Sequence, residues 1–214
     1  MNEKEKIFVY GAGGHAKVVI DILECRGLTI GAVLDDDERL AGKEIMGYKI
    51  LPATDVLQSL IHQNIRQGII AIGDNQVREN KAKLIQSLGY ELVAAVHPQA
   101  VIAKTVRIGV GTVVMAGVVV NSDTVIGENV ILNTGCTVDH DCVIGNAVHI
   151  SPGTHLGGNV AVGERTQVGI GAAVLPNIRI GCDVRVGGGA AVIRDLPDGV
   201  TAVGVPARVI RTRV

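Results

Sequence analysis

The second half of the chain carries a repeat of six residues. From Val96 to Val192, every sixth residue is Val, Ile or Leu, without one insertion. The residue two positions earlier is nearly always small or β-branched, as at Ala100, Thr112 and Cys142. Because side chains alternate along a strand, both members of each pair point to the same side. We therefore expect each unit to be a short strand followed by a turn, with these pairs facing inward.

One such unit is too short to bury its apolar side alone, whereas stacked units form a continuous core. Gly, Asn and Asp recur between the strands, as in residues 126–129, and give the turns the backbone freedom they need. The repeat therefore predicts a parallel β-helix. The pattern is that of the left-handed β-helix, in which three hexapeptides make a coil of eighteen residues. The handedness rests on that resemblance, since the usual crossover rule predicts a right-handed connection.

The first 95 residues follow a different pattern, in which buried strands alternate with amphipathic helices. This alternation predicts a small parallel, Rossmann-like α/β sheet. The predicted strands are 6–10, 30–34 and 68–72, and the predicted helices are 17–26 and 78–88. We thus expect an α/β domain over 1–95 and a β-helix domain with a C-terminal tail over 96–214.

A glycine-rich turn, residues 11–16, follows the first strand and would let a phosphate approach the start of a helix. Acidic residues at 35–37 end the second strand, where a ribose or similar diol would be held. The turn is close to the GxGxxA dinucleotide fingerprint, but the domain is short for a dinucleotide fold. A mononucleotide-type ligand fits this size better. The alternative is a glycine turn that serves packing only.

The stretch VDHDCV, residues 138–143, places charged residues on the outside of the β-helix. Val138 and Cys142 occupy inward positions, so His140 and Asp141 lie on the turn between them. Eighteen residues later stands Gly158, which leaves space beside the histidine. A carboxylate next to a histidine raises its pKa and makes it a better general base. The alternative for an exposed histidine is an ordinary surface position.

Two other chemistries are possible for this region. His149 also points outward, between inward neighbours, and His155 lies in the next coil, so a zinc site shared in a trimer is a minority reading. Spacings of nine and six residues do not stack on one edge as eighteen would, and we expect no metal. Cys142 is inward and is expected to be a core residue. Any acyl transfer should therefore be direct, without an acyl-enzyme.

Composition excludes several classes of partner. A net charge of −1 and 2% aromatic residues favour neither nucleic acid nor an anionic membrane. No apolar run reaches the length of a membrane span, and the first ten residues do not resemble a signal peptide. The four cysteines have no CxxC spacing and are expected to be reduced, as in a cytoplasmic protein.

Several motifs together resemble one family, the hexapeptide-repeat N-acetyltransferases of nucleotide-linked 4-amino-4,6-dideoxy sugars, of the bacillosamine and perosamine type. The sialic acid O-acetyltransferases are close relatives of this family. The motifs are YGAGGHAK at 10–17, LDDD at 34–37, AIGDN at 71–75, DHDCVIGNAVHISPG at 139–153, LGGNV at 156–160, VGIGAAVLPN at 168–177 and GVPAR at 204–208.

The resemblance implies a homotrimer with acetyl-CoA along the β-helix between two subunits, and a nucleotide sugar held by the N-terminal domain. It implies His140 as the base and Asp141 as its acidic partner. The implied acetyl-CoA contacts are His149, Gly158, Ile170 and Gly188. The implied nucleotide-sugar contacts are Gly13, Gly14, His15, Asp35, Asp36 and Gly73.

The leading hypothesis is acetyl transfer from acetyl-CoA to the 4-amino group of a UDP- or GDP-linked sugar, for surface glycan synthesis. The nearest alternative is O-acetyl transfer to a sialic acid or another sugar hydroxyl. A trimeric scaffold that binds a nucleotide without catalysis and a zinc β-helix enzyme are the remaining readings. The sequence favours neither UDP nor GDP.

Overall fold

The computed structural model describes residues 6–212. It divides into two compact units, Met1–Pro98 and Gln99–Val214. Over the described residues, every helix is too short or too polar to cross a membrane.

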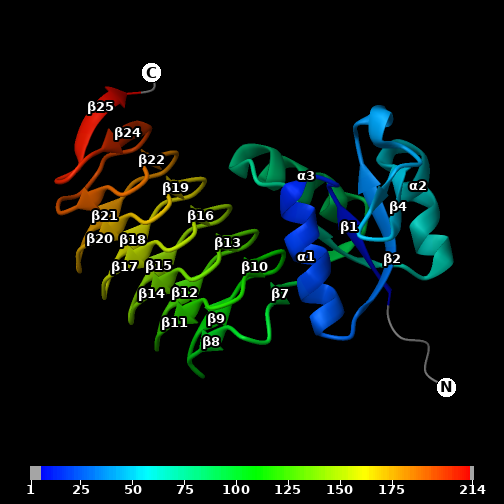
Figure 1. Cartoon of the computed structure of the whole chain (residues 1–214), viewed down its shortest axis with the longest axis horizontal. Helices are drawn as coiled ribbons and strands as arrows, with labels where there is room; N and C mark the ends of the chain where they lie inside the picture. Colours follow the sequence, from blue (N-terminus) through cyan, green and yellow to red (C-terminus); the bar gives the residue numbers. More distant parts are fainter. Residues whose placement is uncertain (1–5, 213–214) are drawn as a thin grey trace. The chain divides into compact units, whose positions relative to one another are not determined.

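The N-terminal unit is built on a six-stranded sheet with strand order β3-β4-β2-β1-β5-β6 (Figure 1). Neighbouring strands are parallel, except that β3 and β4 form an antiparallel hairpin. The elements are β1 (Lys6–Tyr10), α1 (Gly14–Cys25), β2 (Thr29–Asp35), η1 (Glu38–Leu40), β3 (Glu44–Ile45), β4 (Tyr48–Pro52), α2 (Ala53–Leu60), η2 (Ile61–Gln63), β5 (Gln67–Ile70), α3 (Asn75–Ser87), β6 (Glu91–Leu92) and β7 (Ala95–Val96). The predicted parallel α/β sheet is confirmed.

Both predicted helices begin earlier than expected. Helix α1 starts at Gly14 rather than residue 17, so His15 lies in its first turn instead of in a loop. Helix α3 starts at Asn75 rather than residue 78, because the Asp74 carboxylate caps it by accepting a hydrogen bond from the N–H of Val77 at 3.0 Å. The sequence predicts no helix or strand for the segment between β2 and β5. In the structure this segment forms β3, β4 and α2.

The second unit is a left-handed parallel β-helix whose coils stack along one axis (Figure 1). Its strands form three faces. The first face is β8 (Val101–Ile102), β11 (Val119–Val120), β14 (Thr137–Val138), β17 (His155–Leu156), β20 (Ala173–Val174) and β23 (Ala191–Val192). The second is β9 (Arg107–Ile108), β12 (Val125–Ile126), β15 (Val143–Ile144), β18 (Ala161–Val162) and β21 (Arg179–Ile180). The third is β10 (Val113–Val114), β13 (Ile131–Leu132), β16 (His149–Ile150), β19 (Gln167–Val168), β22 (Arg185–Val186) and β24 (Val200–Val203), with β25 (Arg208–Thr212) antiparallel at its end.

The chain runs from the first face to the second, then to the third, and back to the first. We call the turn between the first and second faces the first corner, the next turn the second corner, and the turn from the third face back to the first the third corner. Partners on neighbouring coils are eighteen residues apart, as where Val119 pairs with Thr137 and Thr137 with His155. Corner residues such as Asp141 adopt positive φ, which Asn and Asp tolerate well.

The predicted inward register is confirmed. Every sixth residue from Val114 to Val192 is buried, and so is the residue two before it from Thr112 onward. Where that earlier residue is threonine, its hydroxyl donates a hydrogen bond to the carbonyl fifteen residues later. These bonds run from Thr112 to Gly127, Thr124 to Asp139, Thr154 to Gly169 and Thr166 to Gly181, at 2.9, 2.8, 2.9 and 2.6 Å. We call this contact the inner hydrogen bond, because it joins the core of one coil to the corner of the next.

Candidate active site

His140 lies on the first corner, between β14 and β15. Its Nδ1 is 2.7 Å from Oδ2 of Asp141. The Asp139 carboxylate is engaged elsewhere, since its Oδ1 accepts from the backbone N–H of His140 at 2.9 Å and from Asn121 Nδ2 at 2.8 Å. A neutral His140 therefore carries its proton on Nδ1, facing Asp141. The lone pair on Nε2 is then left to accept a proton.

The electrostatics suit this role. The hydrogen bond to the Asp141 carboxylate, and then the charge of Asp139, raise the pKa of His140 above its usual value. The side chain is 59% exposed, so the ring can reach a ligand lying outside the coil. The predicted pairing of His140 with Asp141 is thus present as a direct contact.

Gly158 lies against the imidazole of His140. A Cβ on Gly158 would be 2.7 Å from His140 Cε1 and 2.8 Å from Nε2, closer than any real contact allows. The surroundings of Gly157, the preceding residue, are different. A Cβ there would instead meet Pro176 of the next coil, at 2.8 Å from its Cδ. Gly158, and not Gly157, therefore makes room for the ring of His140.

Cys142 is fully buried, as predicted. Its Sγ donates toward the carbonyl oxygen of Gly157 at 3.3 Å, and burial raises the pKa of the thiol. A buried, protonated thiol is a poor nucleophile. The structure therefore supports a direct reaction at this corner, without a covalent cysteine intermediate.

The other predicted acetyl-CoA contacts lie on the third face and third corner. His149 opens β16, half-buried, with Nε2 3.1 Å from Nδ2 of Asn133. Ile170 and Gly188 stack one coil apart, where the N–H of Gly189 donates to the Ile170 carbonyl at 2.8 Å. Ile170 is 66% exposed. It lines a hollow of about 320 Å³ with Ser151, Gln167, Gly169, Arg185, Val186, Gly187, Gly188 and Thr201.

Within one chain these two groups do not meet. His140, Asp141 and Gly158 share the first corner, while Ile170 and Gly188 share the third. The first face separates the two corners, and five to six extended residues span about 16–20 Å. The two groups therefore lie at opposite edges of the first face.

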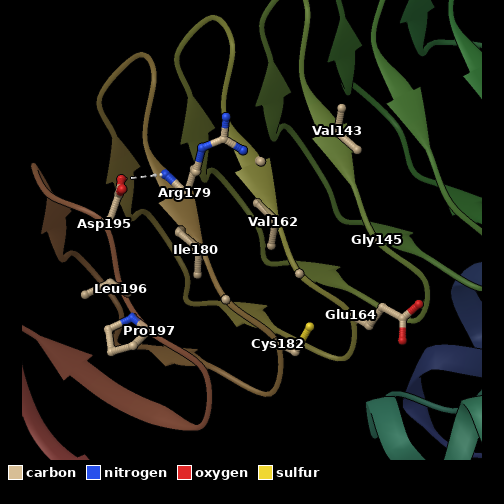
Figure 2. Close-up of a pocket in the computed structure, with 13 residues that line it drawn as sticks. Val143, Gly145, Val162, Glu164, Arg179, Ile180, Cys182, Asp195, Leu196 and Pro197 are labelled. Carbon is tan, nitrogen blue, oxygen red and sulfur yellow. Dashed lines mark hydrogen bonds between the residues drawn. The ribbon is translucent and has the colours of Figure 1, made fainter.

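A groove of about 760 Å³ runs along the second face (Figure 2). It begins at Val143, three residues after His140, and crosses the neighbouring strands at Ala161 and Arg179. Figure 2 shows Arg179 beside Asp195, whose Oδ1 accepts the Arg179 backbone N–H at 2.8 Å. The sequence reading missed this groove, although Val143, Ala161 and Arg179 are outward residues eighteen positions apart.

A second candidate site lies at the carboxyl ends of β1, β2 and β5. The strand order reverses between β1 and β5, which is where parallel α/β sheets bind ligands. The Asp35 carboxylate accepts from the N–H of Ala12 at 2.7 Å and from that of Asp37 at 2.9 Å, tying the glycine turn to β2. All six predicted nucleotide-sugar contacts lie at this edge, in the segments after β1 and β5, in the first turn of α1 or at the end of β2. At Gly13, Gly14 and Gly73 a Cβ would have no atom within 4 Å, so their surface is open.

Two residues at this edge were not predicted. The Tyr10 hydroxyl donates to Oδ1 of Asp36 at 2.5 Å, and Lys81 Nζ lies 2.6 Å from Oδ2 of Asp36. Burial, and then the bond to Asp36, raise the pKa of Tyr10 to about 12. Burial alone would raise the pKa of Asp36, but the bonds from Lys81 and Tyr10 outweigh it and lower that pKa. The cluster therefore holds a charged carboxylate beside a protonated phenol.

His15 and Arg78 lie near the start of α1 and of α3, the helices that follow β1 and β5 at this edge. Arg78 is fully buried and donates to the carbonyls of Ile72 and Gly73 at 3.0 Å each, and to Oδ1 of Asn75 at 2.9 Å. Burial, and then the charge of Arg78, lower the pKa of His15 to about 4. Its Nε2 is buried with no hydrogen-bond partner among the described residues. His15 therefore stays neutral near pH 7.

The three histidines of the zinc reading do not gather within one chain. His140, His149 and His155 lie on a corner and two different faces, and they form no cluster with metal-ligand spacing in residues 6–212. Among residues 6–212, one group of side chains has metal-ligand spacing. It consists of Asp21, Cys25 and His97, whose possible ligand atoms lie within 4.8 Å of one another. None of these residues belongs to either candidate site.

Two family models match the chain. The model described as the PglD N-terminal domain matches residues 6–85. The model described as bacterial transferase hexapeptide (six repeats) matches residues 123–158, a range that includes His140 and Gly158. Each model therefore covers one of the two candidate sites in large part.

Known proteins resemble the chain over one or both units. UDP-N-acetylbacillosamine N-acetyltransferase of Bacillus subtilis (strain 168) is 41% identical over 116 residues, 52% of this chain and 52% of that protein. The chain thus matches about half the length of this curated relative.

Two solved structures match almost completely. PerB from Caulobacter crescentus, in complex with CoA and GDP-perosamine, superposes with a TM-score of 0.93 at 42% identity, covering 98% of this chain and 99% of that one. The acetyltransferase domain of PglB from Neisseria gonorrhoeae FA1090, in complex with acetyl coenzyme A, superposes with a TM-score of 0.90 at 38% identity, covering 97% and 100%. Since the likeness extends over both units and both sites, the chain belongs to the hexapeptide-repeat family of perosamine and bacillosamine N-acetyltransferases.

Proposed function

We propose that this protein transfers the acetyl group of acetyl-CoA to the 4-amino group of a nucleotide-linked 4-amino-4,6-dideoxy sugar. One observation carries the proposal. His140 is backed by Asp141 at 2.7 Å, and its Cε1–Nε2 edge packs against the backbone of Gly158, which carries no side chain. An acceptor amine and a thioester can approach a base placed in this way. The relatives named for bacillosamine and perosamine N-acetylation give the substrate class.

The reaction needs one base and no covalent intermediate. The amine nitrogen attacks the thioester carbonyl carbon and forms the new C–N bond, while the carbonyl π electrons move onto oxygen. Nε2 of His140 accepts the proton that the nitrogen must lose, and Asp141 stabilises the resulting imidazolium. The tetrahedral intermediate then collapses, the C–S bond breaks, and the His140 proton passes to the departing CoA sulfur.

The developing oxyanion needs a hydrogen-bond donor. In the trans peptide that joins Gly157 to Gly158, the C=O and N–H point in opposite directions. The Gly157 oxygen points into the coil, toward Cys142, so the Gly158 N–H points outward beside His140. This N–H has no acceptor among the described residues. We assign it to the thioester oxygen, because preorganised backbone donors are a large source of rate enhancement.

The proposed acetyl-CoA site uses two copies of the chain. The groove that starts at Val143 would form one wall, and the hollow at Ile170 and Gly188 of a neighbouring copy the other, with His149 near the thioester. This division of contacts between two corners supports a homotrimer with active sites between subunits. Sedimentation-equilibrium analysis tests it. A mass three times that of the 22.3 kDa chain is expected, and a monomer that turns over acetyl-CoA at full rate would contradict it.

The nucleotide sugar is assigned to the edge formed by Gly13, Gly14 and Gly73, with Asp35 and Asp36 at the diol or base. Three open glycines leave the backbone accessible to a diphosphate at the start of α1. The nucleotide is UDP or GDP, since relatives of both kinds match. A role in surface polysaccharide synthesis and a location in the cytoplasm complete the proposal. The O-acetyl alternative is disfavoured, because the matched relatives are named for N-acetylation.

The first experiment measures thiol release from acetyl-CoA with purified protein. The acceptor panel holds UDP- and GDP-linked 4-amino-6-deoxy sugars, the same sugars without nucleotide, and a sialic acid. Turnover restricted to a nucleotide-linked amine is expected and would name the nucleotide. Turnover with sialic acid alone would replace the proposal by O-acetylation. Binding of acetyl-CoA without turnover of any acceptor would contradict the assigned substrate class.

A further inference from the structure

We propose that the buried thiol of Cys142 is a positioning residue, which aims the Gly158 N–H at the reacting thioester oxygen. This inference rests on the proposed function. Cys142 touches neither substrate, since its side chain is completely enclosed by the coil. It acts through the peptide group that it holds.

The geometry of a single peptide carries the first step. Cys142 Sγ lies 3.3 Å from the carbonyl oxygen of Gly157, a short contact for a thiol donor. The Gly157–Gly158 peptide is planar, so fixing the direction of its C=O also fixes the direction of its N–H. Gly158 packs directly on His140, so this N–H lies where base, amine and thioester would meet. The thiol thus sets the orientation of the proposed oxyanion donor.

The repeat supplies independent support. At four other coil positions of the same register, threonine makes the inner hydrogen bond to the carbonyl fifteen residues later, at 2.6–2.9 Å. Cys142 makes the same contact, also across fifteen residues, with sulfur in place of oxygen. The thiol therefore fills a structural role that recurs along the β-helix. Here the carbonyl that it holds belongs to a peptide next to the catalytic histidine.

Neighbouring inner hydrogen bonds hold both sides of the corner. Thr124, one coil earlier, donates to the Asp139 carbonyl at 2.8 Å and so holds the peptide that leads into His140. Its Oγ1 also accepts the N–H of Cys142 at 3.2 Å. Thr124 and Cys142 together fix the base and the proposed oxyanion donor relative to each other. Two adjacent glycines have unusual backbone freedom, and the thiol adds a restraint on the peptide between them. Backbone bonds of 2.9 Å already hold the Gly157 N–H and the Gly158 carbonyl on either side.

The test compares Cys142→Val with Cys142→Thr and with Thr112→Val. Valine removes the donor and introduces the β-branched shape that is common at this register, whereas threonine introduces the hydroxyl that the repeat uses elsewhere. Thr112→Val removes an equivalent inner hydrogen bond, to Gly127 on the second corner, outside both candidate sites. The measurements are kcat, the KM for acetyl-CoA, the acidic limb of the pH profile and the thermal midpoint of each full-length protein.

We expect Cys142→Val to lower kcat by at least about tenfold. The loss should be smaller than the roughly 10²–10³-fold loss seen when an oxyanion donor is removed outright. Its KM for acetyl-CoA and its acidic limb should match the wild type. The groove and the side-chain contact between His140 and Asp141 do not include the thiol, whose other neighbour is the His140 carbonyl oxygen at 3.7 Å. Cys142→Thr should recover most of the rate. Thr112→Val should lose thermal stability to a similar degree while retaining the wild-type kcat.

Wild-type kcat in a folded Cys142→Val protein would overturn the inference, as would an equal loss of kcat in Thr112→Val. A shift of the acidic limb would also overturn it, since the thiol would then be acting through His140. If Cys142→Val does not fold, Cys142→Ala removes the donor without adding bulk and carries the same expectations. An active wild type with unaffected variants refutes only this inference, whereas a wild type inactive on the whole acceptor panel refutes the proposed function as well.

Discussion

The imidazole of His140 and the backbone of Gly158 occupy adjoining space that no side chain on residue 158 could share. A Cβ at that position would lie 2.7 Å from Cε1 of the ring and 2.8 Å from Nε2. Gly158 is thus required because of a neighbour eighteen residues away, one coil earlier in the stack.

The first prediction follows from this contact. Gly158→Ala should leave the β-helix folded, because the His140 side chain is 59% exposed and can swing outward. The displaced base should lower kcat by roughly 10²-fold, as small misplacements of catalytic groups do. Steady-state kinetics with acetyl-CoA and the amino sugar check this. Lys104→Ala, on the same corner two coils away, is the control and should keep full activity. Normal turnover by Gly158→Ala would remove the histidine from this position in the mechanism.

The second prediction concerns the base itself. His140→Ala should lower kcat by roughly 10²–10⁴-fold, the usual contribution of a general base, with an unchanged thermal midpoint. Asp141→Asn is the companion variant, because asparagine also tolerates the positive φ of this corner. Near-normal turnover by a folded His140→Ala protein would refute the proposed mechanism.

The third prediction is a pH dependence. The Asp141 hydrogen bond and the Asp139 charge raise the pKa of His140, so its neutral, active form is lost at a higher pH than for a free histidine. Activity should therefore fall as the pH drops through a value above 6.5. Removing the Asp141 charge lowers the His140 pKa, so Asp141→Asn should move the acidic limb of kcat/KM to lower pH. A limb that stays in place would show that another group controls it.

The fourth prediction concerns the glycine turn of the N-terminal unit. Asp35→Ala removes the acceptor of two backbone N–H groups, from Ala12 and Asp37. Hydrogen bonds to a charged group contribute about 1.5–3 kcal/mol each, so the turn should loosen. The KM for the nucleotide sugar should rise about tenfold or more, while the KM for acetyl-CoA stays constant. A parallel rise in both constants would indicate general damage instead of a local effect.

The fifth prediction uses His15. Its folded pKa of about 4 lies below its unfolded value of 6.5, so the unfolded chain binds more protons between these pH values. The free energy of unfolding should consequently rise with pH across that window. As the pH falls from 6.5 to 4, it should decrease by about 3 kcal/mol. Urea denaturation between pH 4 and 7 checks the slope. His15→Gln should flatten it, and His62→Gln, on η2, should not.

The architecture of the β-helix, and which of its residues face outward, can be predicted from the amino-acid sequence alone. A period of six and the alternation of side chains are local properties, and they placed Val138 and Cys142 inside and His140 and Asp141 outside. The stacking distance of eighteen residues follows from the same period. It was enough to bring Gly158 beside His140. The alternation of strands and helices likewise located the glycine turn and the acidic end of β2 at one edge of a sheet.

The contacts between atoms of different coils, and between elements far apart in the chain, depend on three-dimensional packing and cannot be derived from the repeat. Tyr10 and Lys81 are 71 residues apart, and no periodic pattern brings them together around Asp36. The predicted acetyl-CoA contacts are divided between two corners, with Gly158 on the first and Ile170 and Gly188 on the third. The bond from Cys142 to the Gly157 carbonyl spans fifteen residues, a distance set by how an inward side chain reaches the corner of the next coil. Burial is encoded in the repeat, but the partner of a buried polar atom is fixed by three-dimensional packing.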